Sequence, residues 1–94
     1  MGKRNLFVSY DLNAPGQRYE DVIAEIKRHG DWAKVHYSLF YLSTSETASQ
    51  VTEAVWKKMD KNDRLLVVDA SSNEASWHNL SDEVSKFIQE HWRS

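Results

Sequence analysis

The sequence predicts a single α+β domain in which helices pack against an antiparallel sheet, and three observations lead to this fold class. Stretches typical of strands alternate with stretches of helical periodicity, without a linker or an internal repeat between them. The length of 94 residues suffices for one domain. The sequence contains no cysteine, which leaves the stability of the fold to its packed core. We therefore expect residues 1–94 to form one domain, with its core in residues 5–70.

The first predicted strand covers residues 5–11. Phe7 and Val8 favour an extended backbone, and the stretch is apolar on most of both sides, which is typical of a strand inside a sheet. The strand ends on an acidic residue, Asp11. The sequence Asn-Ala-Pro-Gly of residues 13–16 predicts a turn directly after it.

A helix is predicted over residues 18–29, because apolar side chains recur there at the spacing of one buried stripe. Gly30 suits the left-handed position that commonly follows a helix. The next stretch favours extended backbone but carries a polar break at residues 36–38. We therefore expect two short strands, residues 32–35 and 38–42, and one longer strand is the alternative.

A second helix is predicted to open at residues 43–46, where Ser43 and Glu46 have the spacing of a capping box. Its apolar stripe continues to Met59. The most apolar strand of the chain follows at residues 64–70. Both elements are therefore expected to contribute to the core.

The last part of the chain is more polar. Residues 71–76 are predicted to form a polar loop, and a third helix, capped by Ser81, is expected over about residues 80–92. Trp77 and Trp92 flank this helix. Three positions are open to it: the uncovered face of the sheet, an edge of the sheet, or a second subunit.

The order β-α-β-β-α-β-α predicts a ferredoxin-like fold with an extra C-terminal helix. In this arrangement a βαββαβ unit forms a four-stranded antiparallel sheet of order 4-1-3-2, with two helices on one face. Phe7 then lies on the face that these helices do not cover. The end of the first strand lies beside the starts of the third and fourth strands, so Asp11 is expected near Ser38 and Arg64. Asp69 belongs to the opposite end of the sheet.

The charge of the chain limits its partners. Twelve basic and fourteen acidic residues give a formal net charge of −2, so the total charge does not attract nucleic acid. A nucleic-acid partner would require basic residues gathered on one face. The candidates for phosphate contact are Arg18, Lys57, Lys58 and Arg64, and a solvated helix end is the alternative role for the lysines.

The sequence also bears on localisation. No apolar run approaches the roughly 20 residues of a membrane span. The apolar stretch behind the basic N-terminus, residues 6–8, is too short for the core of a signal peptide. We therefore expect a cytoplasmic protein that has no membrane partner.

Asp11 is the strongest candidate for chemistry. A carboxylate at the end of a strand can bind a hard cation such as Mg²⁺, and a bound Mg²⁺ can activate water against a phosphodiester. One carboxylate per chain provides few ligands for a metal ion, but a two-fold dimer would bring two carboxylates together. Two structural roles are equally open to this residue: Asp11 caps the turn that follows the strand, or it forms an ion pair with Arg64.

Three motifs together resemble a known family. The first strand ends in Tyr10 and Asp11, the helix after it ends in Gly30, and residues 34–40 read Lys-Val-His-Tyr-Ser-Leu-Phe. Over about residues 5–70 this pattern is similar to the CRISPR-associated protein 2 family and its relatives, which include VapD-type toxin ribonucleases. A helix stands where the CRISPR proteins have a further strand, so we expect a free-standing bacterial relative.

The resemblance implies a ferredoxin-like fold and a two-fold dimer. It also implies two activities: some members are metal-dependent nucleases, and others are structural partners that hold DNA. Carried over by position, Asp11 matches the metal-binding aspartate and Ser38 matches a serine of the family motif, which makes these two residues the catalytic candidates.

Three functions stay open on the sequence. The first is a dimeric interaction or scaffold protein that binds another protein or nucleic acid. The second is a Mg²⁺-dependent ribonuclease that uses Asp11 across a dimer. The third is one member of a toxin–antitoxin pair, for which the partner is a protein.

Overall fold

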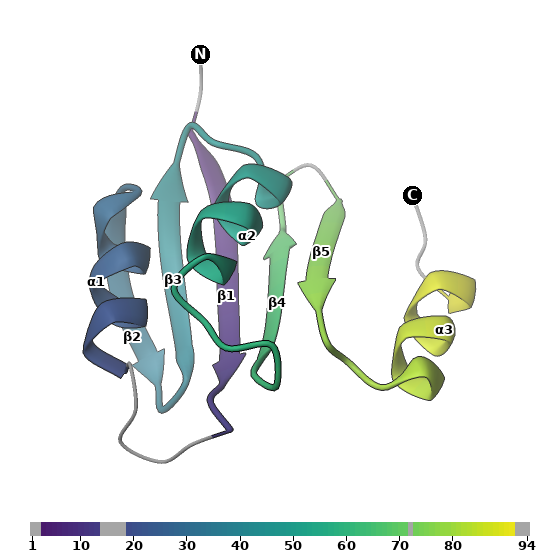
Figure 1. Ribbon diagram of the computed structural model, residues 1–94. Coiled ribbons are helices and arrows are strands. Elements are labelled where there is room, and N and C mark those ends of the chain that lie inside the picture. Colours follow the sequence, from purple (N-terminus) through teal and green to yellow (C-terminus); the bar gives the residue numbers. More distant parts are fainter. Residues whose placement is uncertain (1–2, 14–18, 72, 92–94) are drawn as a thin grey trace.

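The computed structural model describes residues 3–13, 19–71 and 73–91. This part of the chain forms five strands and three helices (Figure 1). They are β1 (Arg4–Asp11), α1 (Tyr19–Arg28), β2 (Asp31–His36), β3 (Leu39–Thr44), α2 (Ala48–Trp56), β4 (Arg64–Asp69), β5 (Glu74–His78) and α3 (Asp82–His91).

The strands form one antiparallel sheet in the order β2-β3-β1-β4-β5. The two short strands expected on either side of the polar break are present as β2 and β3. The first four strands have the neighbours expected from the sequence, with the order counted from the other edge. The sheet nevertheless differs from the expected one, because a fifth strand extends it beyond β4.

The fifth strand corrects the prediction of a polar loop over residues 71–76. The chain turns after β4, with Asn73 in the left-handed region at φ 56°, and enters β5 at Glu74. β5 pairs with β4 so that Trp77 lies opposite Leu66. The strand was missed because its sequence, Glu-Ala-Ser-Trp-His, is mostly polar; an edge strand is held by backbone hydrogen bonds to one neighbour and does not need an apolar run.

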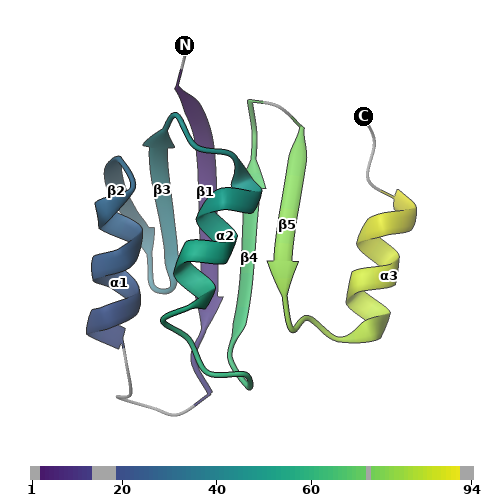
Figure 2. The ribbon, with the colours of Figure 1, turned by 45° about the horizontal axis from the view of Figure 1, so that its top comes forward.

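Both α1 and α2 cover the same face of the sheet, and α3 stands beyond β5 (Figure 2). β1 shows how the sequence divides the two faces, because its side chains alternate between buried and exposed. Leu6, Val8 and Tyr10 are buried toward the helices, whereas Phe7 and Asp11 point to the face without them. The core is therefore one layer between the sheet and two helices. Its largest members are Phe40, Leu6, Ile26, Leu42 and Leu65.

The start of α2 differs from the prediction. Thr47 caps the helix: its hydroxyl accepts the N–H of Gln50 at 3.0 Å, and the Gln50 side chain accepts the N–H of Thr47 at 2.9 Å. The capping box predicted at Ser43 and Glu46 is wrong, because Ser43 belongs to β3 and pairs with Asn5 of β1. Two capping boxes with the same spacing follow one another in this stretch, at residues 43–46 and 47–50, and the pairing of the strand selects the later one.

Gly30 is needed for space. A side chain at this position would collide with the backbone carbonyl of Ser43 in β3. The prediction of a left-handed Gly30 is wrong, since its φ does not lie in the left-handed region. The end of α1 instead passes so close to β3 that only a residue without Cβ fits.

α3 begins where the sequence predicts. The hydroxyl of Ser81 accepts the N–H of Val84 at 3.1 Å, which confirms Ser81 as the cap. None of the residues of this helix is buried, and Val84 and Phe87 are 48% and 61% exposed. The indole of Trp77 donates to the hydroxyl of Ser85 at 3.1 Å and links α3 to the edge strand. None of the described helices is long and apolar enough to cross a membrane.

Candidate functional site

Asp11 is the last residue of β1 and lies directly opposite Arg64, the first residue of β4. Arg64 Nη1 donates to Asp11 Oδ2 at 3.3 Å. The two side chains are 56% exposed for Arg64 and 70% exposed for Asp11. The expected neighbourhood is therefore present, and it includes the ion pair that the sequence left open. Because both groups are in water, this pair contributes little to stability and can exchange for other partners.

Ser38 lies in the turn between β2 and β3, with a left-handed φ of 68°. Its backbone carbonyl accepts the N–H of Tyr10 at 3.1 Å. This bond fixes the hairpin tip against the end of β1, one residue before Asp11. Ser38 is thus placed at the expected rim, and it holds the end of β1 through its backbone.

Three tyrosines gather at the same rim, and sequence reasoning missed them as a group. The rings of Tyr10 and Tyr19 are 6.3 Å apart, and those of Tyr19 and Tyr37 are 6.5 Å apart. The hydroxyl of Tyr37 donates to that of Tyr19 at 3.4 Å. The only signal in the sequence was one tyrosine at each of three sites: the end of a strand, the start of a helix and a hairpin tip.

The phenols of Tyr10 and Tyr19 stay protonated near neutral pH. The hydrogen bond with Tyr37 is the main cause that raises the pKa of Tyr19 to about 12, and burial and nearby charges add to it. Burial, followed by the charge of Tyr37, raises the pKa of Tyr10. Neither group is a base under these conditions, so the cluster offers aromatic surface and neutral hydroxyls.

The rim is braced by a buried carboxylate, Asp63, that sequence reasoning did not single out. Asp63 Oδ1 accepts the N–H of Asn13 at 2.7 Å, and Oδ2 accepts the N–H of Asp60 at 2.7 Å. Its backbone carbonyl accepts from the side-chain amide of Asn79 at 2.7 Å. Asp63 therefore ties the chain after β1, the turn before β4 and the end of β5 together.

A hollow of about 140 Å³ lies beside Asp11 and Arg64. Ser9, Leu66 and Leu80 form part of its lining. This volume is below the several hundred Å³ typical of sites that enclose a small molecule. The hollow can therefore hold part of a ligand at most, with the remainder in solvent or against another surface.

The residues around Asp11 provide only part of a cation site. In residues 3–13, 19–71 and 73–91, no three side chains of His, Cys, Asp or Glu gather in a group suited to a metal. Mg²⁺ accepts one or two carboxylates and completes its shell with water. Asp11 supplies one carboxylate, already paired with Arg64, so a second copy of the chain would have to supply the other.

The predicted phosphate contacts are dispersed. Lys57 and Lys58 follow α2 and are exposed. Arg64 is engaged with Asp11. Arg18 lies outside the described residues. The structure therefore places two of these four cations at the surface just after the end of α2.

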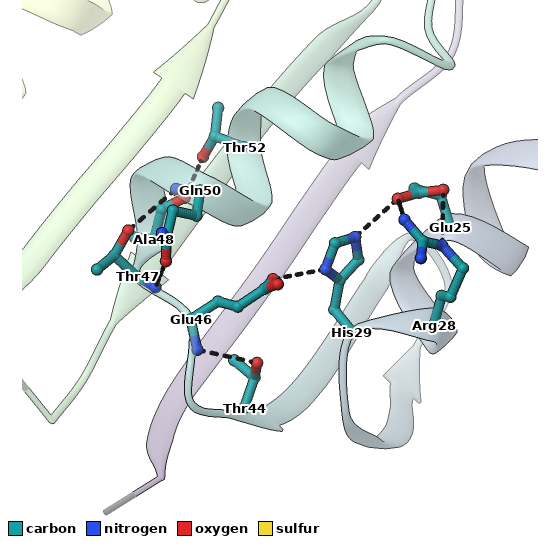
Figure 3. A network of polar contacts seen from close by, with 9 residues as sticks. All are labelled: Glu25, Arg28, His29, Thr44, Glu46, Thr47, Ala48, Gln50 and Thr52. Atoms are coloured by element: carbon teal, nitrogen blue, oxygen red, sulfur yellow. Dashed lines mark hydrogen bonds and ion pairs between the residues drawn. The ribbon is translucent and has the colours of Figure 1, made fainter. Parts of the chain in front are cut away.

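A second polar cluster joins the end of α1 to the start of α2 (Figure 3). The imidazole of His29 is 7% exposed and lies between two carboxylates, with Nε2 at 2.7 Å from Glu25 and Nδ1 at 2.5 Å from Glu46. Carboxylates accept hydrogen bonds, so both contacts are satisfied when the ring carries two protons. Arg28 donates to Glu25 at 2.8 Å.

This cluster resembles a catalytic His–Glu pair in composition only. The ring is enclosed by the two helices, and both of its nitrogens are already bonded. The guanidinium of Arg28, followed by the hydrogen bond of His29, lowers the pKa of Glu25 against the opposing effect of burial. The cluster is thus a charged link between helices rather than a site open to substrate.

The sheet face without α1 and α2 carries apolar side chains in its middle. Phe7 is 37% exposed, and its ring lies 5.6 Å from that of Tyr41 on β3. Between this face and α3 lies a hollow of about 250 Å³. It is lined by Leu66, Val68, Ala75, Phe87, Ile88 and His91.

Comparisons of the chain with models of protein families, with curated proteins and with solved structures find no match. The function is therefore argued from the geometry of the chain itself.

Proposed function

We propose that this chain is a dimeric interaction module that pairs with a second copy through the sheet face left uncovered by α1 and α2. The observation that carries the proposal is the apolar character of this face. It presents Phe7, Tyr41, Leu66, Val68 and Ala75.

An antiparallel sheet with one face in water usually carries polar residues on that face. On β4 the pattern differs: Leu66 and Val68 point away from the helices and are only half-buried. α3 lies beyond β5, and the 250 Å³ hollow separates its apolar side from these strands. Contiguous apolar surface of this kind marks an interaction site.

The dimensions of the face favour a second copy of the chain. Five strands at about 4.8 Å and about five residues at 3.3 Å give a flat area of roughly 400 Å². Side-chain relief and the apolar side of α3 enlarge the accessible area toward the roughly 800 Å² that each partner buries in a stable complex. A flat face that pairs with itself forms a closed two-fold dimer, which leaves no further apolar face exposed.

We also propose a ferredoxin-like ancestry for this domain, with β5 and α3 as additions, and kinship with the CRISPR-associated protein 2 family. The neighbours of the first four strands and the aspartate that ends β1 support this proposal. A dimer through sheet faces is also what the resemblance implies. A strand, β5, does follow β4, so only the helix after it departs from the CRISPR proteins, and this helix favours a role as a free-standing scaffold.

The dimer is tested by light scattering during size-exclusion chromatography. The expected mass is twice the 11.0 kDa of the chain. Phe7→Asp places a charge in the middle of the face and should give the mass of one chain. Ala24→Asp is the matched control, because Ala24 is exposed on α1, on the opposite side of the sheet, and it should stay dimeric.

The interface would be disproved by a single-chain mass for the unsubstituted protein across the accessible concentration range. It would also be disproved if Phe7→Asp remained dimeric while Ala24→Asp became monomeric.

One observation favours a second candidate, the Mg²⁺-dependent ribonuclease. Asp11 projects from the same side of β1 as Phe7 and is 70% exposed, so a dimer through this face would place the carboxylates of both copies at one interface. Asp11 would be the metal ligand, and Arg64 would be released to contact a phosphate. Ser38 would hold the end of the strand in place through its carbonyl.

Labelled RNA incubated with Mg²⁺ tests this activity. Cleavage is expected to stop with a chelator and in Asp11→Asn, and to persist in Asp82→Asn, an exposed carboxylate on α3. If the activity is that of a toxin, expression should slow growth in the same Asp11-dependent manner. Cleavage that continues undiminished in Asp11→Asn would exclude the ribonuclease proposal.

A further inference from the structure

A second surface, on the outer side of α1 and β2, combines exposed aromatic rings with lysines. It consists of Tyr19 and Lys27 from α1, Trp32 and Lys34 from β2, and Tyr37 from the hairpin tip. We call it the aromatic–lysine surface. It lies on the helix side of the sheet, so a dimer through the uncovered face leaves it free.

The rings of this surface are accessible although they are held in place. Trp32 is 45% exposed and Tyr37 is 73% exposed. The ammonium of Lys27 lies 4.1 Å from the centroid of the Trp32 ring, and that of Lys34 lies 5.9 Å from the Tyr37 ring. Each exposed ring thus has a cation over its face, at a distance at which the two attract, and a stacked base would displace that ammonium toward its own phosphate.

An irregularity in β2 brings the second ring to this side. The register between β2 and β3 shifts between Lys34 and His36: Lys34 lies opposite the buried Phe40, but His36 lies opposite Leu39. Leu39 pairs with Ser9 on the uncovered face, so His36 is directed there. After the shift the chain presents Tyr37 to the helix side, against Tyr19. Bulges commonly redirect side chains in this way near functional surfaces.

We propose that the aromatic–lysine surface binds single-stranded nucleic acid by stacking bases on Trp32 and Tyr37 while Lys27 and Lys34 contact phosphates. Every base offers a flat face to an exposed ring, and stacking of this kind is tolerant of sequence. From Trp32 to Tyr37 the chain spans about 16 Å, which matches about five nucleotides at 3.4 Å each.

The charges around the surface predict how the binding behaves. Asp31, at one end of β2, is 87% exposed and paired with Lys3 at 3.3 Å. Glu20 is exposed on α1. With two lysines facing such neighbours in a chain of net charge −2, binding is weak and sensitive to salt. Bases in a duplex are already stacked on one another, so a duplex gains nothing from the rings.

The test is fluorescence anisotropy of labelled oligouridylate and oligothymidylate, about ten nucleotides long, at low salt. Tyr37→Leu and Trp32→Leu should each weaken binding by at least about fivefold, because stacking on one ring is lost. Tyr37→Phe and Trp32→Phe should retain most of the affinity, since a ring remains. These pairs of variants separate stacking from a change in packing.

Two matched double variants test whether Lys27 and Lys34 contact phosphates. Lys27→Gln with Lys34→Gln should reduce the slope of log affinity against log salt by about 1.4, or about 0.7 per phosphate contact. Lys57→Gln with Lys58→Gln removes the same charge from the end of α2 and should leave the slope unchanged. If the second pair instead carries the effect, the binding site lies at the end of α2.

Three results would overturn the inference: no binding of either oligonucleotide at low salt, equal binding of a duplex, or full affinity in both leucine variants. The last would assign the rings and the bulge to protection of the sheet edge. Because these measurements do not depend on the dimer, a monomeric protein that binds would refute the proposed function and leave this inference standing.

Discussion

Asp63 is 2% exposed, and each of its carboxylate oxygens accepts one backbone N–H, from Asn13 and from Asp60. These bonds hold the chain just after Asp11 and the turn just before Arg64. The ion pair between Asp11 and Arg64 is set in water, so the position of both residues depends on this buried neighbour rather than on their mutual attraction. At the scale of single residues, the buried side chain of Asp63 therefore positions Asp11 and Arg64, although it is not itself part of the exposed site.

Replacing Asp63 tests this dependence. Asp63→Ala leaves two N–H groups without their acceptor and should lower the free energy of unfolding by about 1–3 kcal/mol. Urea denaturation followed by tryptophan fluorescence measures the change. Glu53→Ala, an exposed substitution on α2, is the control and should stay within about 0.5 kcal/mol of the unsubstituted chain. An equal, small effect of both would show that the carboxylate is dispensable.

Sequence reasoning found Asp11 and Arg64 because topology alone places their backbones opposite each other. It did not find Asp63 or the tyrosine group, for a physical reason. A carboxylate in a turn looks the same in a sequence whether it is solvated or bonded to the backbone. In the same way, Tyr37 joins Tyr10 and Tyr19 because the β2 bulge redirects the hairpin tip.

At the scale of elements, α1 and α2 are joined by charge as well as by packing. His29 at the end of α1 contacts Glu46, which precedes α2, while its other nitrogen contacts Glu25 within α1 (Figure 3). The cluster could not be predicted from the sequence, in which Glu46 has the spacing of a capping box with Ser43. The partner of Glu46 is instead set by the length of β3, which carries the chain past Ser43.

This link predicts a loss of stability in acid. The pKa of Glu25 is lowered in the folded protein, chiefly by Arg28 and then by His29, so folding favours the ionised form. The stabilisation is present above the unfolded pKa of about 4.5 and is lost as pH falls through the folded value. Glu25→Gln should therefore be less stable than the original chain near neutral pH, with a difference that narrows in acid.

Urea titrations at a series of pH values measure this difference. Glu20→Gln, exposed on the same helix, serves as the control and should show little narrowing. A constant difference between Glu25→Gln and the original chain at all pH values would contradict the assigned charge state of the cluster.

Comparison of the elements explains why β1, β4 and α1 can be predicted from the sequence and β5 cannot. β1 and β4 carry apolar residues because the core requires them, and α1 carries a stripe because one side is buried. β5 has half-buried residues throughout and is positioned by its pairing with β4. Its sequence therefore shows almost no periodic pattern of apolar residues. Two of its side chains nevertheless have partners: the indole of Trp77 donates to Ser85, and the ring of His78 stacks on that of Trp56 at 4.5 Å.

For the whole molecule, the main feature is that the two faces of the sheet differ in how they are covered. One is sealed by α1 and α2, and the other retains apolar residues beside a helix with no buried side chain. The sequence predicted which face would be covered, because the stripes of both helices match it. It left three positions for the third helix, and the structure places α3 at the β5 edge with its apolar side toward the uncovered face.

The position of β5 has a consequence for the behaviour of the chain outside its native state. β4, with the sequence Arg-Leu-Leu-Val-Val-Asp, combines the features that favour intermolecular cross-β stacking: β-branched residues, high hydrophobicity and little charge in its middle. In the native sheet, β1 occupies one side of it and the polar β5 occupies the other. β5 thus acts as a gatekeeper against fibril growth, and its detachment would be the first step by which this protein becomes prone to aggregation.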